Sequence, residues 1–520
     1  MLGRRALPPW RRGSGPSNDL LKSGHQPRMS VIPAPPASSS DSSVQPGRWA
    51  RRLDVLCLIL VLVAVIVAAS GGFRMRVAGV RIALTSPYRL MAFAAALALA
   101  RHLLSPRVPI YRDLPARIVA WWATPPARTA WAALVSTRFA ILFVGFLAVV
   151  MLGYRDGRPP LRLSENELVN LQVRWDTAWY FGIAVDGYRY GSPRATDQQN
   201  IVFFPAFPML MRVAGRLLGG ASTSFILGGT AIALGAFYWA LIYLFKLARD
   251  LLADDDRAAT AVWMIAAFPF ALFYGAVYTE SVFLLGATGA FYHFRRRQLV
   301  KAAAWGLLVG LTRPNGCLLS IPLALMAIAP WAPGWLSGGN PGGIERDPSR
   351  RTVRDLVTAV AAAAAPGIGV LLYSAYIWNL TGSPLAWAAG HAAWGREYRG
   401  LGVLLADRYR YISVAGLYGY TSQLPADLLN GLGALFVLGA AWPVWRRLGA
   451  AYAVFILVNI LPPMAAGGLL SVGRFSSVLF PAFIWFAAIV PAAHRAGWLG
   501  AFMAVQGFNA ALFYTWRELF

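Results

Sequence analysis

Two aspartates lie in a short segment that is rich in aromatic rings and arginines. Asp176 follows Arg174 and Trp175 directly, and Asp186 lies ten residues further on. A carboxylate that reaches a hydroxyl group can remove its proton as a general base. A guanidinium group binds phosphate through paired hydrogen bonds. These residue types at this spacing therefore indicate chemistry on a hydroxyl, with a phosphate group close by.

An interfacial helix would explain part of the same composition. Trp and Tyr side chains gather at the level of the lipid headgroups, with Arg and Asp facing water. This alternative stays open at the level of sequence. It does not explain why a carboxylate lies among indole rings with cations before it and after it.

A second group of candidates surrounds Glu280, which follows Tyr278 and Thr279 and is the only carboxylate between Ala258 and Phe294. One interpretation makes Thr279 a helix N-cap and Glu280 a first-turn acid that is favourable with the helix dipole. The other interpretation has Glu280 orienting an arginine or a substrate hydroxyl in the same cavity as Asp176. The sequence leaves both open.

Arg313 follows an apolar half-span and precedes Pro314. A lone arginine at such a place either extends to a lipid headgroup or binds a phosphate group. Four further residues have the same character, although a purely structural role explains them as simply: His391, Trp394, Arg396 and Arg474.

The sequence also lacks several common motifs. It contains no Walker loop, no dinucleotide-binding glycine fingerprint and no zinc-ligand spacing. The acidic run Asp254-Asp255-Asp256 follows two basic residues, and we interpret it as a solvated loop. We therefore expect no metal and no cofactor, and we expect the energy of any reaction to arrive in a lipid-borne substrate.

The elements that must position these residues are membrane helices. The chain has 520 residues, of which 57% are hydrophobic and 13% charged, and its mean hydropathy is +0.51. Soluble domains carry about a quarter of charged residues. We predict an all-α, polytopic transmembrane bundle of about 11 to 13 spans, since a span needs ~20 apolar residues. The clearest apolar runs are 55–70, 139–154, 224–244, 357–378 and 428–444.

The formal net charge is +26, and much of it lies in short loops between spans. Basic loops stay on the cytoplasmic side of a membrane, so this charge does not require a nucleic-acid partner. If 295–297 and 446–447 are inside, counting spans places the loop 154–208 and Tyr278–Glu280 outside. Cys57 and Cys317 both lie in apolar runs, which indicates neither a disulfide framework nor a metal site.

We expect three parts along the chain. Residues 1–50 are rich in Pro, Ser, Gly and Arg and are expected to form a disordered, basic cytoplasmic arm. Residues 51–130 are expected to form an additional transmembrane hairpin and a cytoplasmic loop. Residues 131–520 are expected to form the main membrane core, whose first outer loop carries the site.

Four segments give the chain a resemblance to a known family. RWDTAWYFGIAVDGYRY, followed by NIVFFPAFP, resembles the first large outer loop of the PIG-V type mannosyltransferases. The order and spacing continue through FPFALFYGAVYTESVFLL and GLLVGLTRPNG, and GSPLAWAAGHAAWGRE and SVGRFSSVLFPAF fit more loosely. The resemblance covers roughly residues 164–483.

The resemblance implies the GT-C superfamily, whose members are multispanning glycosyltransferases that use a polyprenyl-phosphate sugar on the outer face of the membrane. It maps the presumed catalytic base onto Asp176, a tyrosine-threonine-glutamate motif onto Tyr278, Thr279 and Glu280, and an arginine that precedes a glycine onto Arg313. The Arg- and Ala-rich composition is typical of a GC-rich bacterial genome. We therefore expect a bacterial plasma membrane protein with an extracytoplasmic site.

On this basis Asp176, with Glu280, is expected to carry catalysis in the transfer of mannose from polyprenyl-phosphate-mannose to a glycolipid or cell-envelope glycan. Attack by the deprotonated acceptor implies inversion at the anomeric carbon. Arg313, assisted by Arg174 or Arg189, is expected to bind the donor phosphate. The sugar and lipid pocket is expected to include Trp175, Trp179, Tyr180, Phe203, Phe204 and Tyr278, with Asp186 as a further candidate.

Two other classes of protein remain as alternatives. A transporter or lipid flippase places ionisable residues near the bilayer midplane and shows internal repeats, whereas these carboxylates lie in an expected outer loop. A non-catalytic partner subunit would keep the fold without the activity, because fold does not fix function.

Overall fold

The computed structural model describes residues 48–519, with gaps at 71–72, 78–79, 85, 106–108, 110, 156–160, 192–196 and 330–351. Most of the expected N-terminal arm and most of the Gly/Pro-rich segment before residue 352 therefore lie outside the described residues. The expected division of the chain into three parts stays a prediction.

Long apolar helices form the main body of the chain. By length and composition they make it a multi-pass membrane protein, because a helix of about 20 residues spans the hydrocarbon core. Among the described residues, six helices meet this requirement: α4 (Pro125–Leu152), α8 (Ser222–Leu252), α13 (Val353–Thr381), α16 (Pro425–Leu448), α17 (Ala450–Gly467) and α20 (Ala492–Tyr514).

All five apolar runs singled out in the sequence lie in helices, the first in α1 (Arg48–Ser70) and the others in α4, α8, α13 and α16, although α4 already ends at Leu152. The prediction of 11 to 13 spans stays a prediction. The remaining helices of the body are shorter: α9 (Asp255–Ala267), α10 (Glu280–Arg295), α11 (Leu299–Gly310), α12 (Ser320–Ile328) and α19 (Phe480–Ile489).

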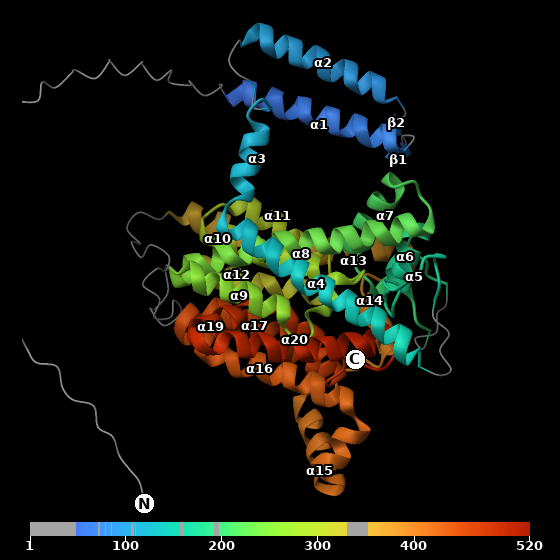
Figure 1. The fold of residues 1–520 in the computed structure, drawn as a ribbon, viewed down its shortest axis with the longest axis vertical. Coiled ribbons are helices and arrows are strands. Elements are labelled where there is room, and N and C mark those ends of the chain that lie inside the picture. The colour runs from blue at the N-terminus through green and yellow to red at the C-terminus, as the bar shows by residue number, and fades with distance from the viewer. Residues whose placement is uncertain are drawn as a thin grey trace, which may run out of the picture.

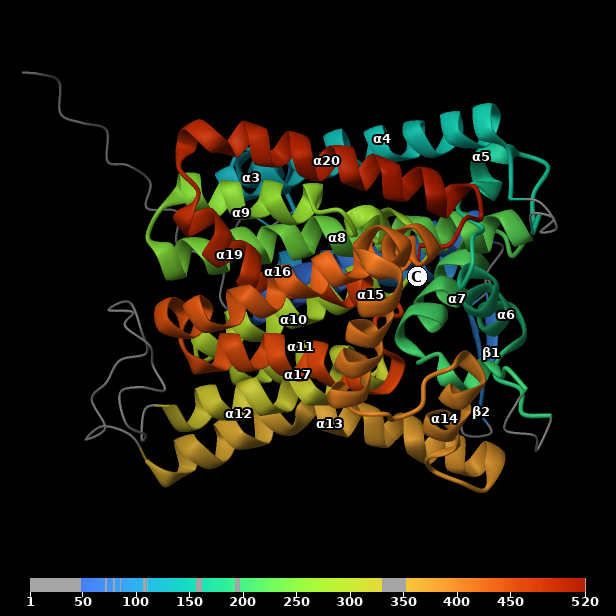
Figure 2. The same cartoon turned by 90° about the horizontal axis from the view of Figure 1, so that it is seen from below.

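The helices run side by side in the bundle (Figure 2), and small residues let several of them approach closely. α11 packs on α13. A Cβ atom on Gly310 would lie 2.0 Å from the carbonyl oxygen of Pro366, which only glycine avoids. A Cβ atom on Gly316 would lie 2.2 Å from the carbonyl oxygen of Val309. The 3-10 helix η3 (Pro314–Leu319) therefore folds back onto the end of α11, and Arg313 lies in extended conformation in the break between them, after a turn at Leu311 and Thr312.

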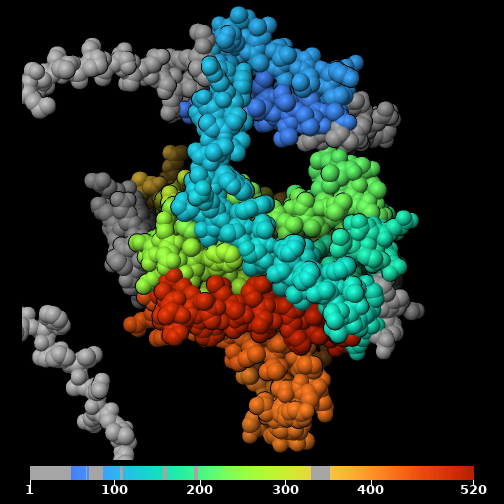
Figure 3. Space-filling view, viewed as in Figure 1, coloured from blue at the N-terminus to red at the C-terminus, as the bar shows by residue number. Residues whose placement is uncertain are grey.

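The first part of the described chain is set apart from the bundle (Figures 1 and 3). α1 (Arg48–Ser70) packs against α2 (Pro87–Leu104), and the short antiparallel strands β1 (Phe73–Val77) and β2 (Val80–Leu84) join them. α3 (Leu114–Trp122) leads back to the bundle. The all-α prediction is confirmed for the described chain, with this strand pair as the exception.

Short elements gather at one end of the bundle, where Figure 2 shows α5, α6, α7 and α14 together. α15 (Leu401–Gln423), which is interrupted at Gly416 with φ 71°, projects from the body (Figure 1). The other short elements are α5 (Glu167–Asn170), α6 (Thr177–Asp186), η1 (Asn200–Val202), α7 (Ala206–Leu217), η2 (Ala271–Gly275), α14 (Ala386–Ala389), η7 (Gly390–Trp394) and α18 (Val472–Ser477).

Candidate active site

Four charged side chains from four separate segments form a continuous chain of ion pairs. Arg474 Nη1 lies 2.9 Å from Asp176 Oδ2, and Arg474 Nε lies 2.7 Å from Glu280 Oε1. Glu280 Oε1 also pairs with Nη2 of Arg313. Arg313 Nε donates a hydrogen bond to Thr279 Oγ1 at 2.7 Å. We call Asp176, Arg474, Glu280 and Arg313 the ion chain.

Asp176, at one end of the ion chain, is its most exposed member. The Glu280 side chain is 0% exposed and the Arg313 side chain 6%. The Arg474 side chain is 11% exposed and the Asp176 side chain 23%. Oδ2 of Asp176 is bound by Arg474, while Oδ1 accepts no hydrogen bond from the described residues. Asp176 is therefore the carboxylate that a substrate hydroxyl can reach.

A strained turn presents Asp176 at the start of α6. Trp175 has a φ of 50°, a left-handed conformation that is uncommon for a bulky residue and is found at sites where surrounding contacts enforce it. Its Nε1 donates to the carbonyl oxygen of Phe513 at 3.2 Å, and its ring packs against Trp516. The Asp176 amide then donates to the Tyr278 hydroxyl at 3.0 Å. These contacts fix the backbone of the exposed carboxylate.

Arg174 anchors this turn and does not reach the ion chain. Its Nε donates to the carbonyl oxygen of Tyr514 at 2.8 Å, and its Nη1 donates to the carbonyl oxygens of Asn170 and Val173. The residue is 1% exposed. Arg174 was expected to assist in binding a donor phosphate. Its guanidinium group is instead occupied by backbone carbonyl oxygens.

The turn before α10 places Glu280 and Tyr278. α10 begins at Glu280, with Thr279 at the N-cap position, but the Thr279 hydroxyl accepts from Arg313 and does not cap the helix. Glu280 is thus both a first-turn acid and the carboxylate shared by two arginines. The two interpretations of this residue are compatible.

Arg138 braces the same segment from α4, and sequence analysis assigned it no role. Its Nη2 donates to the carbonyl oxygen of Ala266 at 2.9 Å, and its Nη1 donates to that of Ala271. These two carbonyls flank the break between α9 and η2. Arg138 is 3% exposed and is the only charged residue in α4 after Arg128, which was the signal available in the sequence.

A third guanidinium lies beside the ion chain. The Cζ atom of Arg396 lies 5.5 Å from the centre of the Phe475 ring, and the Cζ atom of Arg313 lies 5.8 Å from the same ring. Within the described residues the Arg396 side chain has no ion pair and no hydrogen bond. Burial lowers the pKa of Arg396 to about 10, with a smaller contribution from Arg474, so this group stays charged at neutral pH.

The charges of this group do not balance. Asp176 and Glu280 contribute two negative charges, and the three arginines contribute three positive charges, which leaves one net positive charge (3 − 2). A guanidinium without a counter-ion at a partly buried position favours binding of an anion.

Aromatic rings from three segments lie next to Asp176. Trp179 stacks on Phe203 with 5.7 Å between ring centres, and Trp394 packs edge-on against both rings. Tyr180 is buried, with its ring edge-on to Phe203 and Tyr278. Four of the six expected pocket residues thus come together, namely Trp179, Tyr180, Phe203 and Tyr278, and Trp394 joins them from η7. Trp175 packs instead against Trp516.

Other candidates lie apart from this cluster. Phe204 packs behind it, against Tyr373 and Trp387. Arg189 pairs with Asp186 at 3.2 Å, and their side chains are 73% and 47% exposed. The structure therefore does not bring Arg189 or Asp186 to the ion chain.

His391 lies in η7 with its ring edge-on to Trp387. Burial, with a smaller effect of Arg396, lowers the pKa of His391 to about 4, so its imidazole is neutral at pH 7. In the described part of the chain no group of three or more His, Cys, Asp or Glu side chains is arranged to hold a metal ion.

Residues 161–327 match the family described as Mannosyltransferase (PIG-V). This match confirms the resemblance expected from the sequence over the segment that contains Asp176, Glu280 and Arg313. The expected resemblance extended further, to about residue 483. Arg396 and Arg474 lie beyond the matched residues.

The same similarity is found with curated relatives. GPI mannosyltransferase 2 from two strains of Cryptococcus neoformans var. neoformans serotype D is 29% identical over 181 residues, which is 33% of this chain and 40% of the relative. The chain thus matches less than half of the length of these relatives.

Among solved structures, the chain is similar to the Archaeoglobus fulgidus oligosaccharyltransferase complex with Zn and sulfate, at 15% identity and a TM-score of 0.32, over 72% of this chain and 52% of that one. The complex of the archaeal oligosaccharyltransferase AglB with an inhibitory peptide and a dolichol-phosphate gives 13% identity and a TM-score of 0.32, over 73% and 55%. Similarity at this level decides neither fold nor function.

The position of Arg474 is the main finding that sequence analysis underrated. It contacts both carboxylates, although it was only one of four additional candidates. Arg474 stands alone in an apolar stretch just after α17, in α18, where a buried charge needs a partner.

Proposed function

We propose that this chain is a membrane glycosyltransferase that transfers mannose from a polyprenyl-phosphate-mannose donor to an acceptor hydroxyl of a glycolipid or envelope glycan. The family match over 161–327 supports the reaction class. The observation that carries the proposal is the partly exposed carboxylate of Asp176 at the end of the ion chain, with Arg396 close by as an arginine without an ion pair among the described residues. We further propose that the reaction takes place on the outer face of a bacterial plasma membrane.

Asp176 acts as the general base. Its Oδ1 accepts the proton of the acceptor hydroxyl while the hydroxyl oxygen attacks the anomeric carbon of mannose. The bond between that carbon and the donor phosphate oxygen breaks, and the polyprenyl phosphate leaves with both electrons of the bond. A single displacement of this kind inverts the anomeric configuration. Arg474 holds Oδ2 at 2.9 Å and thereby aims the free oxygen.

The leaving phosphate gains negative charge as this bond breaks. Preorganised positive groups at such a position often contribute more to the rate than any other feature of an active site. We assign this role to Arg396 together with Arg313, because both guanidinium groups lie on the Phe475 ring. Arg174 and Arg189 are not retained in this role, since the first binds backbone carbonyls and the second pairs with Asp186.

The aromatic cluster of Trp179, Phe203 and Trp394 would contact the apolar face of the sugar. Phe204 is buried behind this cluster and would support it without contacting the donor. Tyr278 positions Asp176 through the amide of that residue and supports Arg474, whose Cζ atom lies 4.9 Å from the Tyr278 ring centre.

The test uses the purified full chain in lipid vesicles with radiolabelled polyprenyl-phosphate-mannose and a lipid extract of bacterial membranes. We expect Asp176→Asn to lower transfer about 10²- to 10⁴-fold, the usual contribution of a general base, while donor binding is retained. Asp186→Asn is the matched control and should transfer at the wild-type rate.

An Asp176→Asn variant with full activity would overturn the assignment of the base. Movement of donor across sealed vesicles by both proteins, without transfer, would instead identify the chain as a transporter.

A further inference from the structure

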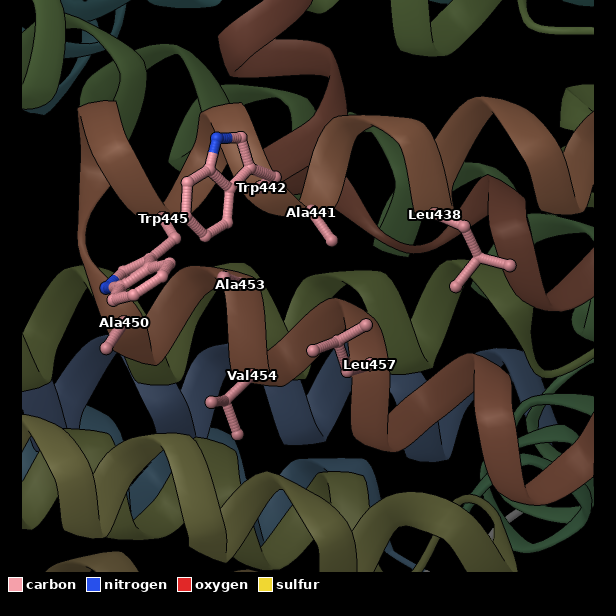
Figure 4. Close-up of a pocket in the computed structure, with 8 residues that line it drawn as sticks. All are labelled: Leu438, Ala441, Trp442, Trp445, Ala450, Ala453, Val454 and Leu457. Atoms are coloured by element: carbon pink, nitrogen blue, oxygen red, sulfur yellow. The ribbon is translucent and has the colours of Figure 1, made fainter.

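An apolar groove lies between α16 and α17, on a part of the bundle that the proposed reaction does not use. The groove has a volume of about 480 Å³, within the range of ~300–1,000 Å³ that small-ligand sites occupy. In Figure 4 Trp445 and Ala450 lie at one end of it, where α16 turns into α17, and Leu438 lies at the other end.

The groove is well separated from the ion chain along α16. Asn430, near the start of α16, accepts a hydrogen bond from the Gly473 amide beside Arg474. Arg446 follows sixteen residues later. At a rise of 1.5 Å per residue the two positions are about 24 Å apart. A ligand in the groove therefore has no direct contact with the reacting groups.

Two features of the groove point to a lipid. All of its lining residues are apolar, and two of them are the indole side chains Trp442 and Trp445. Tryptophan is enriched where the hydrocarbon core meets the headgroups. An acyl chain that enters the groove beside these rings would have its headgroup at the end of α16.

The charge at that end selects the kind of headgroup. Arg446 and Arg447 follow Trp445 directly, in the last turn of α16, and both are exposed. Within the described residues neither has an acidic partner. Basic pockets between membrane helices bind the headgroups of anionic lipids, and a guanidinium binds a phosphate group with two hydrogen bonds.

We propose that the groove between α16 and α17 binds one acyl chain of an anionic glycerophospholipid, whose phosphate headgroup is held by Arg446 and Arg447. This site is independent of the proposed transfer reaction, and its test does not use that reaction.

The experiment places the full-length protein in phosphatidylcholine vesicles that contain a small fraction of phosphatidylglycerol with a photoreactive diazirine on one acyl chain. After irradiation, peptides with a lipid adduct are mapped. We expect adducts on the segment 438–457, several-fold more frequent than with the same probe on a phosphatidylcholine headgroup.

Two variants separate the parts of the site. Arg446→Gln/Arg447→Gln should reduce labelling by phosphatidylglycerol about to the level of the neutral probe, and Ala453→Phe should reduce it by filling the groove. Arg112→Gln/Arg128→Gln removes two exposed charges elsewhere and should leave labelling unchanged. Each variant is checked for monodispersity and for a wild-type melting temperature in phosphatidylcholine alone.

Equal labelling by the two headgroups, or labelling unaffected by the arginine substitutions, would overturn the proposal in favour of ordinary surrounding lipid. Loss of labelling in the arginine variant but not in Ala453→Phe would contradict the proposal that the acyl chain lies in the groove. A photoreactive side chain at Val454 that is linked to a second protein copy, and not to lipid, would show that a protein occupies this surface.

Discussion

Two buried ion networks in this chain have opposite designs. In the α1–α2 hairpin, Arg101 Nε lies 2.7 Å from Asp54 Oδ1, and both side chains are 1% exposed. Water is excluded from this pair. In the ion chain two arginines pair with two carboxylates, Arg396 lies beside them as a third arginine, and the Asp176 side chain is 23% exposed. The first pair is sealed from water, while the second group includes a partly exposed carboxylate and, in Arg396, an arginine with no ion pair among the described residues.

The comparison indicates which buried charges in a membrane protein are candidates for an active site. A buried charge costs several kcal/mol unless it is paired, so a balanced and sealed pair needs no further explanation. An unbalanced set has to be explained by something that completes it. The hairpin pair is accounted for by packing, whereas the ion chain with Arg396 is the group to which we assign the proposed reaction.

Apart from the loss of transfer in Asp176→Asn, the largest expected effect is on the stability of the α1–α2 hairpin. Asp54→Asn removes the carboxylate that is paired with the buried Arg101, and breaking a buried ion pair typically costs about 3–5 kcal/mol. We expect the hairpin to open more readily, so hydrogen exchange in α1 and α2 should become faster while α8 and α10 stay protected. Transfer by the folded core should be unchanged.

Replacing both partners, as in Asp54→Leu/Arg101→Leu, is the matched control and should restore slow exchange. Loss of transfer in Asp54→Asn without faster exchange in the hairpin would contradict the comparison, because it would give the sealed pair a functional role.

A smaller effect is expected from removing the surplus charge. Arg396→Gln should weaken donor binding by about 10- to 150-fold, since a hydrogen bond to a charged group contributes about 1.5–3 kcal/mol. The change should appear in the KM for the donor and in the affinity for polyprenyl phosphate, with little change in melting temperature. Arg399→Gln is the control, because Arg399 is exposed and lies 3.7 Å from Glu397. Equal effects of the two substitutions would remove Arg396 from the site.

The smallest effect concerns pH. The pKa of His391 is lowered to about 4, so the unfolded chain binds a proton near pH 6.5 that the folded chain does not bind. Stability contributed by neutral His391 is therefore complete above pH 6.5 and is lost as the pH falls towards 4. His391→Asn should reduce the fall in melting temperature between pH 7 and pH 5. An unchanged fall would show that His391 is not buried as described.

Part of the candidate site could be predicted from the sequence. The rest could not, because it depends on contacts between residues that are far apart in the chain. Asp176, Glu280 and Arg313 lie in recognisable local motifs. Arg474 is 298 residues from Asp176 and 194 from Glu280, and no local pattern connects them. Arg174 illustrates the reverse error. Its neighbour Trp175 takes a left-handed conformation, so adjacent charges point to different surroundings.

The fold was predictable to a similar extent. Apolar length identified the main helices, because the bilayer sets their size. The strand pair between α1 and α2 was not predicted, since five-residue strands among scattered arginines give no clear periodicity.

Arg138 connects the segment between α9 and α10 to α4. Its guanidinium ties the carbonyls of Ala266 and Ala271, on the two sides of the break, to the middle of α4. A change in the distance between these two carbonyls would strain or break at least one of the two bonds. The backbone that leads from α9 towards Glu280 is thereby attached to a long apolar helix as well as to its own neighbours.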